Sequence, residues 1–99
     1  MKKRFIVAVD SNIDKQNDSF IKFIKENGLG WWHWIDNFWL LVSANKDLNT
    51  TKIREAVNES FPGSYCLVIE FTGNPNDWSG FGPKTKDRDM FSWLHRNWK

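Results

Sequence analysis

Residues 31–42 read WWHWIDNFWLLV, and this stretch decides the fold. An aromatic and branched apolar run lies on either side of Asp36-Asn37, a pair that suits a two-residue hairpin turn. The stretch therefore predicts an antiparallel β-hairpin. It also carries four of the seven tryptophans of a 99-residue chain. Tryptophan is enriched at interaction surfaces, so we expect part of the surface to meet a partner.

The tryptophans of this hairpin cannot all face one core, because side chains alternate between the two faces of a strand. We expect Trp32 and Trp34 on one face of the first strand. Trp31, His33 and Ile35 are expected on the other face. At least one of these sets should lie outside a core formed under helices.

The elements around the hairpin follow from periodicity. An apolar strand over 4–9 precedes a helix that Asp14 or Asn17 is expected to cap and that Gly28 ends. After the hairpin, a second amphipathic helix begins near Asn49 or Thr50 and ends before Pro62-Gly63. Residues 65–71 then supply a fourth strand.

The order β-α-β-β-α-β predicts a ferredoxin-like α+β fold, a two-layer sandwich with both helices on one face of the sheet and an open opposite face. The core motif should span residues 1–71 of a single domain, 1–99, with an extension over 72–99. In the extension we expect a loop and a last helix with Asp87 and Asp89 in its first turn and Arg96 and Lys99 in its last. Its large aromatic side chains should pack onto the sheet or onto a second subunit: Trp78, Phe81, Trp93 and Trp98.

Composition narrows the classes of function. The net charge is +2, from 14 Lys and Arg against 12 Asp and Glu, so any nucleic-acid footprint must be local. No apolar run of membrane-spanning length and no signal peptide is present, which predicts a cytoplasmic protein without a membrane partner. The single cysteine, Cys66, excludes an internal disulfide, and its apolar surroundings predict a buried, inert thiol.

Candidate site residues gather after the first strand. Asp10 closes this strand, and a strand-end carboxylate beside its copy in a symmetric dimer can hold Mg²⁺ for phosphodiester cleavage. Asp is equally an ordinary turn and helix-cap residue. Ser11, Asn12 and His33 could assist catalysis, with His33 as a general base or as a buried hydrogen-bonding group.

Candidate binding residues combine aromatic rings and cations. Such side chains can grip a protein or stack and neutralise a nucleic acid. The set consists of Asn12, Trp32, Trp34, Lys84, Lys86 and Arg88.

Three blocks of the chain together resemble the small bacterial and phage SinR-like proteins, which resemble in fold the CRISPR-associated protein 2 and virulence-associated protein D families. The blocks are the strand ending in Asp10, the block 30–36 with Trp39-Leu40, and the block 67–73 with 78–81. The resemblance implies a homodimer in which Asp10 of each subunit faces its mate. It also implies either a metal-dependent nuclease or a structural adaptor, in toxin, defence or counter-defence systems. The chain departs from the usual pattern with Val9, where an aromatic residue commonly precedes the Asp.

Two classes of function remain. We expect a dimeric binding or adaptor protein that needs no cofactor. The alternative is a metal-dependent endonuclease acting on RNA or DNA through Asp10 and Mg²⁺ at the dimer axis. A nuclease usually gathers more than one acid per site, and here only the dimer axis can supply the second one.

Overall fold

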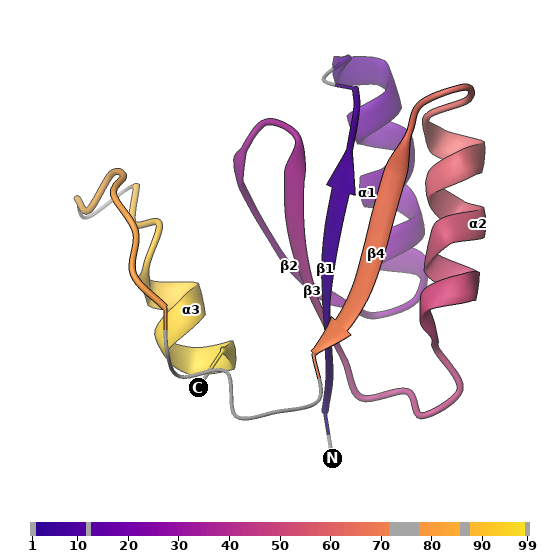
Figure 1. The fold of residues 1–99 in the computed structure, drawn as a ribbon. Helices are drawn as coiled ribbons and strands as arrows, with labels where there is room; N and C mark the ends of the chain where they lie inside the picture. The colour runs from indigo at the N-terminus through magenta and orange to yellow at the C-terminus, as the bar shows by residue number, and fades with distance from the viewer. Residues whose placement is uncertain (1, 12, 72–77, 86–87, 99) are drawn as a thin grey trace.

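The computed structural model describes residues 2–11, 13–71, 78–85 and 88–98, and it shows a ferredoxin-like α+β fold (Figure 1). A four-stranded antiparallel sheet has the strand order β2-β3-β1-β4. The expected order of elements is therefore confirmed. The elements are β1 (Lys3–Val9), α1 (Asp14–Glu26), β2 (Gly30–Ile35), β3 (Phe38–Ser43), α2 (Thr50–Ser60), β4 (Cys66–Phe71) and α3 (Ser92–Asn97).

The main core lies between one face of the sheet and the two long helices, α1 and α2 (Figure 1). Alternate residues of β1 point into it, because the period of a strand is two, while α1 contributes residues four apart on one helix face. The Phe20 ring meets Trp39 edge-on at 5.0 Å between centroids. The fully buried large side chains of the main core are Phe5, Val7, Phe20, Ile24, Trp39, Leu41, Ile53, Val57 and Phe61.

The N-terminal cap of α2 agrees with expectation, and the N-terminal cap of α1 differs from it. Asn49 caps α2, and its side-chain oxygen accepts a 2.9 Å hydrogen bond from the Lys52 N–H. The expectation that Asp14 or Asn17 caps α1 is wrong, because Ile13 occupies that position without a side-chain cap. Asp14 is instead the first helical residue, where its negative charge interacts favourably with the positive end of the helix dipole.

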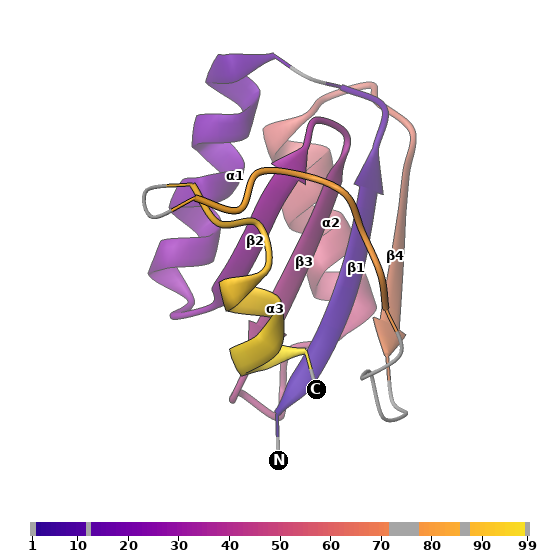
Figure 2. The same cartoon turned by 90° about the vertical axis from the view of Figure 1, so that its left-hand side faces the viewer.

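The opposite face of the sheet is not open, contrary to expectation. The C-terminal extension crosses it, and α3 lies over the sheet on the side away from α1 and α2 (Figure 2). Trp32 Nε1 donates to the Met90 carbonyl at 2.7 Å, and Arg4 Nε donates to the Asn97 carbonyl at 2.8 Å. The second core consists of Trp32, Leu40, Val42, Met90, Leu94 and Trp98.

The large aromatic residues of the extension pack in or against this second core, with the exception of Phe81. Trp78 and Trp93 are half-buried against it, and Trp98 is buried within it. Trp78 Nε1 donates to the Trp98 carbonyl at 3.2 Å. Phe81 is 100% exposed, so it does not pack onto the sheet of its own chain, and its packing onto a second subunit stays a prediction.

The last helix is shorter than expected. It begins at Ser92, so Asp89 lies ahead of it rather than in its first turn; Asp87 and Lys99 lie outside the described residues. The Asp89 carboxylate accepts from the N–H groups of Phe91 and Ser92 and from the Ser92 hydroxyl. The carboxylate thereby satisfies N–H groups at the start of the helix.

The first strand of the hairpin carries a bulge that changes the expected alternation. Trp32 pairs with Leu40 and Ile35 with Phe38, so β2 has one residue more than β3 between these pairs. Ile35 consequently lines the same hollow as Trp32, whereas strict alternation placed it on the opposite face. In the described part of the chain, every helix is too short or too polar to cross a bilayer.

Candidate functional sites

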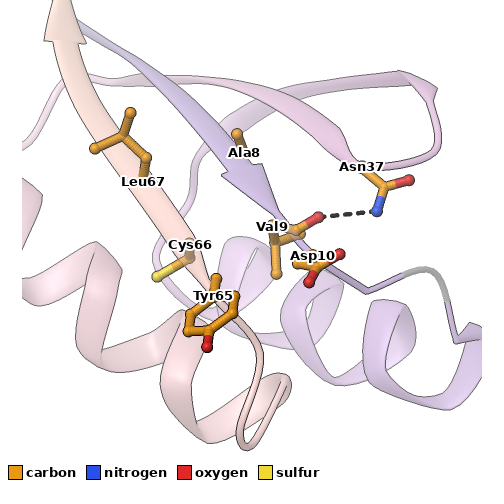
Figure 3. A pocket seen from close by; sticks show the side chains of 7 residues that line it. All are labelled: Ala8, Val9, Asp10, Asn37, Tyr65, Cys66 and Leu67. Atoms are coloured by element: carbon orange, nitrogen blue, oxygen red, sulfur yellow. Dashed lines mark hydrogen bonds between the residues drawn. The ribbon is translucent and has the colours of Figure 1, made fainter.

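The first candidate site is the shallow hollow around Asp10, at the end of β1 (Figure 3). The Asp10 N–H donates to the Tyr65 carbonyl at 2.8 Å, which extends the pairing of β1 with β4. Asn37, from the hairpin turn, donates from its side chain to the Val9 carbonyl at 3.0 Å. The exposed Asp10 side chain is thus held beside Asn37, Tyr65 and Cys66.

This hollow fits Mg²⁺ poorly when a single chain is considered. Among the described residues that line it, Asp10 is the sole carboxylate, and the other polar side chains are an amide, a phenol and a thiol. Magnesium is held mainly by carboxylate oxygens together with water or phosphate. No group of three or more His, Cys, Asp or Glu that could hold a metal occurs in the part of the chain that the structure describes.

The two assisting residues that are described do not line the Asp10 hollow. The Ser11 hydroxyl donates to the Gln16 side chain, at the start of α1. His33 stacks on Trp39 with 3.6 Å between ring centroids, and its Nδ1 lies 3.0 Å from the Phe38 carbonyl. Because a carbonyl oxygen accepts, this contact requires a proton on Nδ1, and the half-buried ring has a packing role. Asn12 lies outside the described residues.

Cys66 is a free thiol, but it is half-buried rather than buried. It lines the Asp10 hollow and also a second hollow beside α2 with Arg54. Cys66 is therefore less buried than the sequence predicted. The cause is that β4 is an edge strand, so one side of Cys66 has no neighbouring strand in the part of the chain that the structure describes.

The second candidate site is an aromatic hollow beside β2, which we call the Trp34–Arg88 hollow. The Arg88 guanidinium lies over the Trp34 ring, 5.8 Å from its centroid. Trp34 is 37% exposed, whereas Trp32 is only 4% exposed. Trp32 is thus a core residue of this chain, and Trp34 with Arg88 presents the accessible polar and aromatic surface. The hollow is lined by Trp31, Trp32, His33, Trp34, Arg88 and Trp93.

Arg88 is the cation that lines this second site, and Lys84 lies outside its lining. The backbones of Lys84 and Asp89 form a β-bridge, and the Thr85 N–H donates to the Arg88 carbonyl at 2.8 Å. Lys84 and Arg88 are both exposed. Lys86 lies outside the described residues. Folding therefore brings Arg88 to Trp34, although the two are far apart in the sequence.

A third surface, which the sequence did not predict, lies along β4. Along β4 and the residue before it, Tyr65, Leu67 and Ile69 are 83%, 61% and 45% exposed. We call these three residues the β4 strip. The apolar run 65–71 by itself favoured burial, whereas the alternation of a strand at the sheet edge leaves alternate side chains of this run exposed. The C-terminal extension covers the sheet next to β2 and β3 and leaves β4 at its margin (Figure 2).

The fold defines the class of this chain as a ferredoxin-like α+β protein. Comparison of the chain with families of known proteins, with curated proteins and with solved structures gave no match.

Proposed function

We propose that this chain is a homodimeric binding or adaptor protein rather than a nuclease. The observation that carries the proposal is the β4 strip, an exposed row of large apolar side chains beside the unpaired edge of a sheet. Uncovered apolar surface next to a free strand edge is typical of an interface. A homodimer of this kind would agree with the adaptor members of the families that the sequence resembles.

The binding surface of the dimer for a further partner is, in this proposal, the Trp34–Arg88 hollow. Exposed indole rings stack on nucleobases, and an arginine beside them neutralises phosphate. The solvent-accessible Trp34 ring and the Arg88 guanidinium supply this combination. The partner class that we favour is single-stranded nucleic acid.

The experiment compares binding with cleavage on the same probes. Purified protein is mixed with labelled single-stranded and double-stranded RNA and DNA at low salt, with Mg²⁺, Mn²⁺ or EDTA. We expect binding of single strands that does not depend on the metal, no cleavage, and at least about a tenfold loss of affinity in Arg88→Ala and in Trp34→Ala. Arg96→Ala, which removes an exposed cation from α3, is the matched control.

Other outcomes count against the proposal. Cleavage that vanishes both in EDTA and in Asp10→Ala would overturn the preference for a binding protein and favour the nuclease. Equal affinity of Arg88→Ala and the control would overturn the role of the Trp34–Arg88 hollow. If no probe binds, nucleic acid is the wrong partner class for this hollow.

A further inference from the structure

We infer that two copies of this chain join through β4, edge to edge and antiparallel, with Val68 on the two-fold axis and with Arg54 of each copy paired to Glu70 of the other. This inference rests on the proposed homodimer and specifies its interface. It follows from the free edge of β4, from the direction of its backbone groups and from the charges beside it.

Of the two sheet edges formed by the described residues, β4 is the one suited to pairing. The strand order places β2 and β4 at the two edges. The bulge between Trp32 and Ile35 interrupts β2, and bulges obstruct edge pairing. By contrast, β4 keeps an unbroken register with β1 from Cys66 to Phe71 and contains no Pro or Lys. The β4 edge therefore carries a single charge, Glu70, and no Pro, Lys or bulge that would prevent association.

The backbone directions follow from one hydrogen bond. The Asp10 N–H donates to the Tyr65 carbonyl, so Tyr65 is a residue whose backbone groups face β1. Because these directions alternate along an antiparallel strand, Leu67, Ile69 and Phe71 also face β1. The N–H and C=O groups that face the free edge are those of Cys66, Val68 and Glu70.

A two-fold axis at Val68 uses all of these free groups. It places Val68 opposite its own copy and Cys66 opposite Glu70 of the other copy, so each residue with outward backbone groups meets another one. Leu67 and Ile69 of opposite copies then form the closely spaced pair on the exposed face. Their side chains cover each other, which buries part of the β4 strip.

The charges beside the edge agree with this register. Cys66, Val68 and Glu70 pair with Val9, Val7 and Phe5 of the main core, so their side chains lie on the helix face of the sheet. Arg54, an exposed residue of α2, shares a hollow with Cys66 and Val68 on that face. The register brings Glu70 of the second copy opposite Cys66, and therefore next to Arg54. By symmetry, the same pair forms twice.

The inferred dimer places the Asp10 residues of the two copies far apart. Asp10 continues β1 at the level of Tyr65, and the axis at Val68 sends the second copy of Tyr65 to the far end of the paired strands. At about 3.4 Å per residue along a strand, the two Asp10 residues would be on the order of 20 Å apart. They would not share one metal ion in this dimer.

A charge exchange tests the interface. Glu70→Lys alone places Lys against Arg54 in both pairs of its homodimer, and Arg54→Glu alone places Glu against Glu70. Each variant should raise the dimer Kd at least about tenfold, because like charges oppose each other across the interface. In an equimolar mixture, the two variants complement each other, and both pairs of a mixed dimer are attractive. Native mass spectrometry at low salt distinguishes mixed dimers from homodimers.

The controls are Glu59→Lys and Lys52→Glu, which make the same charge changes at exposed positions elsewhere on α2. Weakened single variants with restored mixed dimers are expected. Single variants that dimerise like the controls, or a mixture that stays monomeric, would overturn this interface while the dimeric function stands. A monomeric unmodified chain would overturn the proposed function as well.

Discussion

Trp32 Nε1 donates a 2.7 Å hydrogen bond to the backbone carbonyl of Met90, which joins the sheet to the C-terminal extension at a buried position. This bond explains why an indole from the hairpin is a core group and not a surface group. It also ties the extension to β2, the strand whose exposed Trp34 ring lies under Arg88 of the same extension.

Loss of this hydrogen bond should destabilise the protein. Trp32→Phe keeps an aromatic ring but removes the donor, and the buried Met90 carbonyl loses its partner. We expect the free energy of unfolding to fall by about 1 to 3 kcal/mol in a urea titration. Trp34→Phe, at the exposed neighbour, should change it by less than about 0.5 kcal/mol. Equal effects of the two substitutions would contradict the assignment of Trp32 to the core.

The extension should contribute to stability through its buried aromatic residues. Trp98 is 5% exposed and Phe81 is 100% exposed, although both belong to the same extension. Trp98→Ala should lower the free energy of unfolding by about 3 to 5 kcal/mol. Phe81→Ala should leave it within about 0.5 kcal/mol. A small effect of Trp98→Ala would mean that the extension does not pack on the sheet in solution.

Asp89 gives a prediction for acid pH. The hydrogen bond from the Ser92 side chain, together with the backbone N–H of Phe91, lowers the pKa of Asp89 below its ordinary value of 3.8. Because the folded pKa is the lower one, the stabilising effect is complete above 3.8 and is lost as the pH falls through the folded pKa. An NMR titration of this carboxyl should show the lowered pKa, and Ser92→Ala should raise it. A titration at or above 3.8 in the unmodified protein would disagree with the observed geometry.

The sequence predicted the order of the elements well, because strand and helix periods are local properties of the chain. The turn at Asp36-Asn37 and the cap at Asn49 are likewise set by nearby residues. The packing of Trp78, Trp93 and Trp98 on the sheet agrees with one of the two expected arrangements, but which aromatic side chains pack there was not predictable from the sequence. Whether an aromatic side chain folds back onto the sheet depends on surfaces that are distant in the sequence. Trp98 and Phe81 are both large aromatic residues of the extension, yet Trp98 is buried and Phe81 is exposed.

The candidate sites also depend on contacts between residues that are distant in the sequence, and these contacts could not be predicted from local patterns. A bulge altered the alternation that had placed Ile35, and no local signal marked it. The contact of Trp34 with Arg88 joins β2 to the C-terminal extension, two segments more than 50 residues apart, so no local pattern marked it. Asp10 was correctly placed at a strand end, but its neighbours Tyr65 and Asn37 come from other elements.

The mass of the unmodified chain in solution tests the central claim most directly. Multi-angle light scattering after size exclusion, at micromolar concentration and low salt, measures this mass without reference to shape. We expect a mass twice the 11.7 kDa of one chain, because the β4 edge and the β4 strip should be covered by a second copy. A mass of a single chain across the concentration range would contradict this expectation.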